Sequence, residues 1–321
     1  MFKISVITCT HNPRPDYLAQ TVEGLARQSL PLDRWEYLLI DNASRPGRAP
    51  NLDLSWHPQA RIIREEQLGL TPARLRGIRE ALGSLLVFVD DDNVIDPNFL
   101  DEVLRVAEQE PFLGSWGGQC RPRFDQPPPE WTRRYWGSLA IREFDSDRWS
   151  NVRWFLGAMP CGAGLCVRRE VAQRYLALNE NGDRKRFQLD RTGDSLVSGG
   201  DHDLAGCACD LGMGIGLIST LKLTHLIPPQ RLTLPYLARL EEGIVVSGIL
   251  LGLERGEPVP SARGLVGRLA DQLRLLRLRG PHREILRAHY RGRAKALKIW
   301  SNRGATTNSL QDHAGNREEP T

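Results

Sequence analysis

The chain has 321 residues, of which 40% are hydrophobic and 26% charged, and its formal net charge is +4. This length can bury a sizeable core, and the composition is that of a folded globular protein, which excludes wholesale disorder. No stretch reaches the roughly eighteen apolar residues of a membrane span, and the first residues lack the apolar run of a signal peptide. Six cysteines are scattered without the spacing of a zinc site. These features predict a protein of the reducing cytoplasm.

The first forty residues predict a strand, a helix and a second strand. Residues 4–8 form a short apolar run, after which Leu18, Val22 and Leu25 recur at helical spacing. Residues 35–40 supply the next apolar run. Such alternation of short apolar runs with a 3.6-residue period is typical of an α/β protein.

A second helix is predicted from Thr71, which would be its N-cap, with Pro72 at the first helical position. Its apolar stripe would consist of Leu75, Ile78 and Leu82. The uninterrupted apolar run LLVFV at 85–89 then predicts a parallel strand covered on both faces, and Asp96-Pro97 opens another helix. The pattern predicts a doubly wound sheet whose ligands bind at the carboxyl ends of the strands.

The pattern loosens after Gly118. RPRFDQPPPEW is interpreted as a proline-rich loop, and the polar segment 179–200 as a binding loop or lid. Four tryptophans in this region could stack on sugar rings, although core packing is the commoner role. They are Trp131, Trp136, Trp149 and Trp154.

Basic residues concentrate near the carboxyl terminus. Residues 261–303 contain twelve Lys or Arg against Asp271 and Glu284. Apolar residues at helical spacing from Leu265 predict one helix, Gly280-Pro281 would end it, and a second would follow. This segment could rest on an anionic membrane surface or form a solvated helical extension. The aromatic platform of a single-stranded nucleic-acid site is missing, so we predict no nucleic-acid partner.

Three carboxylates, Asp90, Asp91 and Asp92, directly follow the LLVFV strand. Their mutual repulsion would be relieved by a hard cation, and oxygen ligands suit Mg²⁺ or Mn²⁺. Polar residues also follow the first two strands, namely 8–12 and 41–44. Because these strand ends meet at one sheet edge, a joint site is predicted; taken alone, the acidic triplet is equally compatible with a turn.

These motifs, taken in order, resemble those of family 2 glycosyltransferases of the GT-A fold over roughly residues 3–230. The resemblance implies one α/β catalytic domain with a doubly wound mixed sheet, followed here by a helical basic extension. The nucleotide-sugar half would comprise residues 1–118 and the acceptor half 119–240. Residues 241–303 would form the extension and 304–321 a disordered tail.

The resemblance implies a donor site at the ends of the first strands. Residues after the first two strands hold the base in that family, and GLTPARLRGI resembles its G-x-x-x-A-R-N-x-G segment, with Leu75 in place of asparagine. Asp90 would contact the ribose, with Asp91 beside it. The implied nucleotide-sugar-binding residues are Thr8, Thr10, Asn12, Asp41, Arg74, Asp90 and Asp91.

The resemblance also implies a metal site and a general base. Asp92 would hold Mn²⁺ or Mg²⁺, and His225 lies where many relatives place a metal-binding histidine. Segment 199–204, GGDHDL, resembles the family's G-E-D-x-D-L, with Gly200 in place of glutamate. Asp201 then matches the general base of inverting members, although acidic residues here could equally favour the start of a helix.

The implied function is transfer of a sugar from a nucleotide-diphosphate sugar, with UDP favoured, to a glycan or lipid-linked acceptor. Inversion at the anomeric carbon and a role in cell-surface polysaccharide synthesis are the family's usual setting. The implied location is cytoplasmic, with peripheral contact at the inner face of the plasma membrane through 261–303. A sugar nucleotidyltransferase of related fold and a non-catalytic nucleotide-sugar-binding relative are the alternatives.

Overall fold

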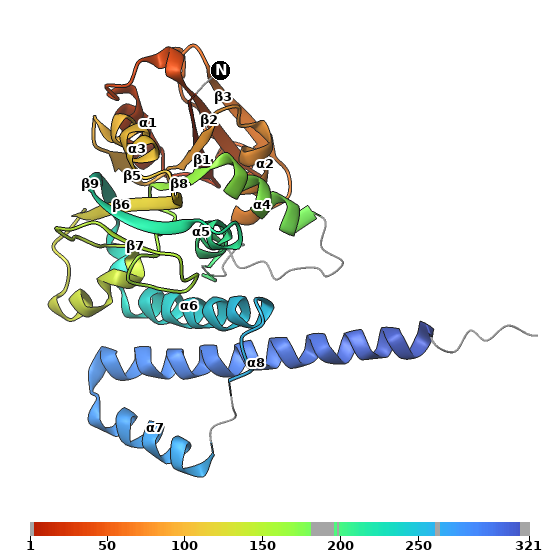
Figure 1. The fold of residues 1–321 in the computed structure, drawn as a ribbon. Coiled ribbons are helices and arrows are strands. Elements are labelled where there is room, and N and C mark those ends of the chain that lie inside the picture. Colours follow the sequence, from red (N-terminus) through yellow and green to blue (C-terminus); the bar gives the residue numbers. More distant parts are fainter. Residues whose placement is uncertain (1–2, 181–195, 198, 261–263, 315–321) are drawn as a thin grey trace, which may run out of the picture.

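The structure, a computed structural model, describes residues 3–180, 196–197, 199–260 and 264–314 (Figure 1). Within these residues the chain forms one mixed sheet with the strand order β3-β2-β1-β4-β8-β6-β9-β5, and β7 pairs with β9. The expected α/β architecture is confirmed. The strands are β1 (Ile4–Thr10), β2 (Trp35–Asn42), β3 (Ala60–Glu65), β4 (Leu85–Phe88), β5 (Asn93–Ile95), β6 (Leu113–Phe124), β7 (Arg148–Ser150), β8 (Leu165–Arg168) and β9 (Gly214–Ile227).

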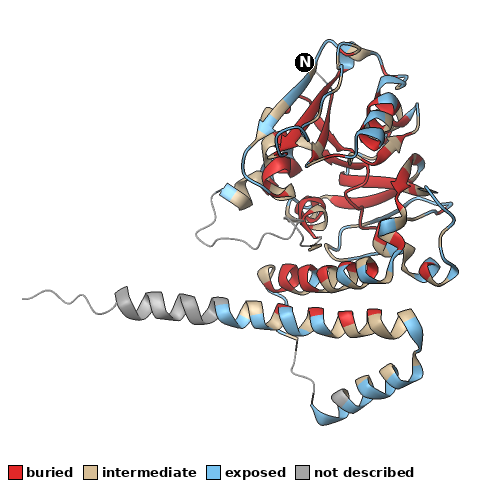
Figure 2. Ribbon diagram, turned by 180° about the vertical axis from the view of Figure 1, so that it is seen from behind, coloured by how far each residue is buried: buried red, intermediate tan, exposed pale blue. Residues whose placement is uncertain are grey.

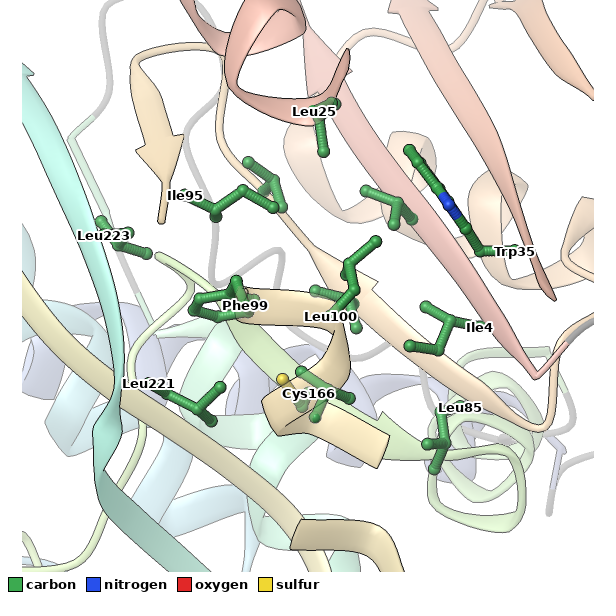
Figure 3. Packing of buried hydrophobic residues seen from close by; sticks show 14 of the residues in the cluster. Ile4, Leu25, Trp35, Leu85, Ile95, Phe99, Leu100, Cys166, Leu221 and Leu223 are labelled. Atoms are coloured by element: carbon green, nitrogen blue, oxygen red, sulfur yellow. The ribbon is translucent and has the colours of Figure 1, made fainter. Parts of the chain in front are cut away.

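Helices cover both faces of the sheet, as a doubly wound arrangement requires (Figure 1). Helices α1 and α3 bury one core with β1 and β4, in which Leu25, Phe99 and Leu100 pack toward Ile4 and Leu85 (Figure 3). Helices α2, α4 and α5 bury a second core on the other face. The α-helices are α1 (Pro15–Ala26), α2 (Leu70–Glu80), α3 (Phe99–Gln109), α4 (Arg169–Glu180), α5 (Gly200–Asp210), α6 (Leu234–Glu254), α7 (Leu265–Arg277) and α8 (Gly280–Ala314).

Strand directions bring several chain segments to one sheet edge. Strands β1, β2, β3 and β4 pair in parallel, and β6 and β9 share their direction because β8 pairs antiparallel with both β4 and β6. The short strand β5 then pairs antiparallel with the end of β9, opposing Asn93 to His225. The carboxyl ends of β1, β2, β4 and β9 therefore lie at the same edge.

The proline-rich loop predicted after Gly118 begins later than expected. Strand β6 continues to Phe124, so RPRF is extended and pairs with β9. Pro122 is tolerated because β8 pairs only with Ser115 and Trp116, which leaves the later part of β6 near an edge. A partner strand far along the chain determined this extension, and the local pattern does not contain that information.

Helix α2 also begins differently from the prediction. Its N-cap is Gly69, with φ at 137°, so Thr71 lies inside the first turn. Only glycine readily adopts this φ, and its N–H donates to Asn42 Oδ1 at 2.8 Å. The helix ends at Glu80, which leaves Leu82 outside it and exposed.

The helix expected after Asp96-Pro97 begins at Phe99, as α3. Of the polar segment 179–200, residues 181–195 and 198 lie outside the described residues. The four tryptophans do not line the cavity at the carboxyl edge of the sheet. Trp131, Trp136 and Trp154 pack against apolar clusters, and Trp149 on β7 is exposed beside Phe112.

The carboxyl-terminal segment is helical, as predicted. Helix α6 packs along α8, and α7 lies beyond α8, away from the sheet (Figure 1). Gly280, with φ at 56°, separates α7 from α8, so the predicted break is confirmed. Helix α8 continues to Ala314, so it does not end at the expected boundary of residue 303. Within the described ranges, no helix combines the length and hydropathy of a membrane span.

Candidate active site

A cavity of about 360 Å³ lies at the carboxyl edge of the sheet. It combines side chains from the ends of β1, β2, β4 and β9 with the start of α2 and α5. Ser138, Leu139 and Ala140, at the end of the short helix η2 (Glu130–Leu139), complete one wall. Seven of the residues predicted from the sequence line this cavity, namely Thr10, Arg74, Asp90, Asp91, Asp92, Asp201 and His225.

The acidic turn after β4 is held by a hydrogen bond from β1. Thr10 Oγ1 donates to Asp91 Oδ2. Burial, with the neighbouring charges of Asp92 and Asp90, raises the pKa of Asp91 to about 7, although the Thr10 hydrogen bond opposes the shift. Asp91 is therefore partly protonated near neutral pH, and less negative charge accumulates here than three aspartates would suggest.

Asp92 and His225 meet because β5 pairs with β9, and Leu226 N donates to Asp92 O at 2.8 Å. Asp92 Oδ2 lies 3.5 Å from His225 Nε2, and both side chains are 8% exposed. Arg231, in the short helix η3 (Pro229–Leu232), contacts both of them. Its Nη2 lies 2.7 Å from Asp92 Oδ2, and its Nη1 lies 2.9 Å from His225 Nε2.

The donor atoms of Asp92 and His225 fit a divalent ion. Neighbouring ligands of an octahedral ion at about 2.1 Å lie roughly 3 Å apart, close to the separation of these two atoms. Carboxylate oxygen and imidazole nitrogen suit Mn²⁺, and carboxylate oxygen suits Mg²⁺. No group of three or more His, Cys, Asp or Glu in the described part of the chain could hold a metal. A bound molecule or water would supply further ligands beyond those of the described residues.

Asp201 lies in the first turn of α5 and is held by backbone donors. Gly162 N donates to its Oδ2 at 2.7 Å, and His202 N donates to its Oδ1 at 2.9 Å. Burial alone would raise the pKa of Asp201, but the charges of His202 and Arg74 and these two hydrogen bonds lower it overall. Asp201 is therefore ionised at neutral pH and can accept a proton.

Gly162 lies close to the side chains of both Arg74 and Asp201. A Cβ at this position would lie 2.9 Å from Arg74 Nη2 and 3.4 Å from Asp201 Oδ2. Cys161, Gly162 and Ala163 all line the cavity. The glycine thus lets the backbone reach the carboxylate while Arg74 lies alongside.

Three predicted residues, Thr8, Asn12 and Asp41, do not line the cavity. Thr8 is buried within β1, two residues before Thr10. The backbone N–H of Asn12 donates to Ser44 Oγ at 2.8 Å, which joins the ends of β1 and β2. Asp41 is paired with Arg64 at 2.6 Å. Their roles in binding stay predictions.

Sequence reasoning missed several residues of the cavity wall. Arg231 follows a PP pair in LTHLIPPQR and has no motif spacing of its own, so only the pairing of β5 with β9 reveals its position. His11 and Asn42 lie within segments that were singled out, although neither was assigned a role. His11 Nδ1 lies 2.7 Å from Asn42 O, which links the ends of β1 and β2.

Comparison with solved structures bears on the fold. GalNAc-T7, crystallised with UDP, GalNAc and Mn²⁺, is similar with a TM-score of 0.50 and 15% identity over 81% of this chain and 52% of its own. TarS of S. aureus, residues 1–349, aligns with a TM-score of 0.49 and 16% identity over 90% of this chain and 72% of its own. The fold is the GT-A fold of glycosyltransferases.

The family model for glycosyl transferase family 2 matches residues 5–176, more than half of the chain. The chain belongs to glycosyl transferase family 2.

Two curated relatives share part of the chain. The putative glycosyltransferase EpsH of Bacillus subtilis is 26% identical over 113 residues, which are 34% of this chain and 32% of EpsH. The uncharacterised glycosyltransferase YwdF of the same organism is 29% identical over 116 residues, 35% of this chain and 41% of YwdF. The matched region thus spans less than half the length of these relatives.

Proposed function

We propose that the protein transfers a sugar from a nucleotide-diphosphate sugar, with UDP as the favoured nucleotide, to a hydroxyl of a glycan or lipid-linked acceptor. The observation that carries this proposal is that Asp92 and Asp201, from the acidic turn after β4 and the start of α5, line one cavity. Asp92 would hold a divalent ion at the diphosphate of the donor. Asp201 would accept the proton of the acceptor hydroxyl. Family membership supports the reaction class.

In this proposal the first half of the chain, residues 1–118, binds the donor. Thr8, Thr10, Asn12 and Asp41 would surround the base, Arg74 would face the nucleotide, and Asp90 and Asp91 would contact the ribose. Thr10, Arg74, Asp90 and Asp91 lie on the cavity wall, which supports their assignment. Arg74 would add a positive charge for the diphosphate.

Asp92 and His225 would hold Mn²⁺ or Mg²⁺. When bound, the ion would supply Lewis-acid stabilisation of the charge on the leaving nucleotide diphosphate. The distance between Asp92 Oδ2 and His225 Nε2 supports this pair of ligands. That GalNAc-T7 was crystallised with Mn²⁺ and UDP agrees with such a pairing of metal and nucleotide.

Asp201 would act as the general base. The acceptor hydroxyl gives its proton to the carboxylate of Asp201 while its oxygen bonds to the anomeric carbon, and the bond from that carbon to the diphosphate oxygen breaks. Attack opposite the leaving group inverts the anomeric configuration. The lowered pKa of Asp201 supports the ionised form that this role needs. The backbone donors at Gly162 and His202 would fix the orientation of the carboxylate.

We further propose that residues 119–240 bind the acceptor, and that 241–303 form an extension that contacts a membrane through residues 261–303. Ser138 to Ala140 line the cavity from the acceptor half. In the extension, α7 exposes Leu265 and Leu269, 80% and 64% respectively, with Arg274 nearby on the same helix. An exposed apolar stripe with basic residues fits the headgroup region of anionic lipids. The proposed location is the inner face of the plasma membrane, in cell-surface polysaccharide synthesis.

Calorimetric titration tests the donor assignment. UDP, GDP and dTDP would be titrated into the protein with Mn²⁺ and then with EDTA, and repeated on Asp92→Asn. We expect metal-dependent binding of UDP that the substitution weakens. UTP would be titrated in parallel, and its binding in preference to UDP would favour a sugar nucleotidyltransferase instead. Nucleotide-sugar binding without transfer to any acceptor would favour a non-catalytic relative.

A further inference from the structure

Arg231 contacts the two atoms that would bind a divalent ion, Asp92 Oδ2 and His225 Nε2. Its Nη2 lies 2.7 Å from Asp92 Oδ2 and its Nη1 lies 2.9 Å from His225 Nε2. A guanidinium carries only donors, so His225 Nε2 must be the acceptor, and its lone pair points at Arg231. The ring's other nitrogen, Nδ1, is buried without a hydrogen-bond partner in the described residues. Among the described residues, the contact with Arg231 is therefore the hydrogen bond that orients this imidazole.

The guanidinium and a divalent ion are therefore mutually exclusive at these two atoms. Each would neutralise the carboxylate of Asp92 and each would use the lone pair of His225 Nε2. Asp92 and His225 are each only 8% exposed, so water does little to replace a lost partner. An ion that enters must displace Arg231, and the displaced guanidinium then needs another anion.

The surroundings of Arg231 allow such a movement. Its helix is anchored by Leu232, which is buried in an apolar cluster with Leu237 and Ile285. The Arg231 side chain itself is 22% exposed and lines the cavity. The anchored backbone keeps the guanidinium within reach of the cavity, where a diphosphate offers oxygens that accept several hydrogen bonds from an arginine.

We propose that Arg231 is an internal counter-cation that holds Asp92 and His225 in the free protein and is released when a divalent ion and a diphosphate bind together. Arg231 is thus a positioning residue that makes metal binding depend on the donor. The free protein binds the ion weakly, and the nucleotide diphosphate tightens that binding because it receives the displaced guanidinium. The role of the diphosphate in this inference rests on the proposed function. The competition between Arg231 and the ion does not depend on it.

Electron paramagnetic resonance of Mn²⁺ measures the competition without any sugar transfer. Mn²⁺ would be titrated into the full chain, wild type and Arg231→Met, first alone and then with saturating UDP. We expect Arg231→Met to bind Mn²⁺ alone about tenfold more tightly, since a hydrogen bond to a charged group shifts an equilibrium by about that factor. We also expect UDP to tighten Mn²⁺ binding less in Arg231→Met than in the wild type.

Further variants locate the effect. Arg121→Met removes an arginine that pairs with Asp96 away from the cavity, and it should leave Mn²⁺ binding unchanged. Adding His225→Ala to Arg231→Met should abolish the gain. Arg231→Lys should fall between wild type and Arg231→Met, because an ammonium lacks the fork that spans both partners. It also keeps a charge at this position if the methionine variant fails to fold, which circular dichroism would show.

Unchanged or weaker Mn²⁺ binding by folded Arg231→Met would overturn the inference, as would an equal gain in Arg121→Met. If the wild type binds no nucleotide under any condition, the proposed function fails. The titration with Mn²⁺ alone would still decide whether Arg231 competes with the ion.

Discussion

The helices that cover the sheet and helix α7 both carry leucines at helical spacing, but these leucines differ in how far they are buried. Leu100 on α3 is fully buried, whereas Leu265 on α7 is 80% exposed. The burial colours show strands of the sheet mostly as buried and the outlying helix α7 mostly as exposed or intermediate (Figure 2). Helices cover both faces of the sheet, whereas α7 packs against α8 and leaves Leu265 and Leu269 exposed. The apolar stripe of α7 therefore contributes little to folding, and it remains available for a surface outside the protein. The spacing of apolar residues predicted the secondary structure of both regions. Whether an apolar face contributes to folding depends on the elements that pack against it.

The largest expected effect concerns chemistry at the sheet edge. Asp201→Asn should lower the transfer rate by about 10²–10⁴-fold, because an amide cannot take the acceptor proton. Nucleotide binding should persist, since Asp201 is assigned to the acceptor. The rate would be measured with saturating donor, and Asp33→Asn, on an exposed residue of the helix η1 (Leu32–Arg34), serves as the control. Full activity in Asp201→Asn would contradict the assignment of the base.

A pair of identical substitutions tests the comparison between the sheet and α7 directly. Leu100→Ala should lower the free energy of unfolding by about 2–5 kcal/mol, because it leaves a cavity in a closed core. Leu269→Ala, on the exposed face of α7, should change it by less than about 0.5 kcal/mol. Urea unfolding followed by circular dichroism would measure both. Similar losses of unfolding free energy in the two variants would show that α7 is covered in solution, and would contradict the contrast drawn between α7 and the sheet.

Membrane contact can be tested by sedimentation with lipid vesicles. The double variant Leu265→Ser and Leu269→Ser should weaken binding to anionic vesicles at least about tenfold, because burial of each leucine contributes roughly 1.5–3 kcal/mol. The control places serine at Leu82 and Leu156, which are 59% and 73% exposed outside α7. Equal loss in both variants, or no binding by the wild type, would argue against the proposed contact.

The smallest expected effect is a shift in pH dependence. The lowered pKa of Asp201 keeps its carboxylate ionised as pH falls, so the acid limb of kcat/KM should lie below the usual range of an aspartate. His202→Gln removes the leading charge that opposes the effect of burial, which should move that limb to higher pH. The backbone donor from residue 162 and the charge of Arg74 would remain. His289→Gln, on α8, should leave the profile unchanged.

Local patterns were sufficient for the elements that carry the acidic turn. Runs such as LLVFV and the spacing of Leu18, Val22 and Leu25 predicted β4 and α1, because buried strands and amphipathic helices have periods that are visible in the sequence. Motif resemblance then indicated the family and seven of the residues that line the cavity. Asp90 to Asp92 and Asp201 line one cavity although they lie far apart in the chain.

Features that depend on contacts between distant segments of the chain could not be predicted from local patterns. The extension of β6 through RPRF required the long strand β9, and the start of α2 required the φ of Gly69, which no spacing reveals. The contact of Arg231 with Asp92 depends on the pairing of β5 with β9. Local patterns and motifs thus predicted the first strands and helices, the carboxyl-terminal helices and the family of this protein. Which charges meet depended on the tertiary structure, because charge pairing depends on distances between segments that are remote along the chain.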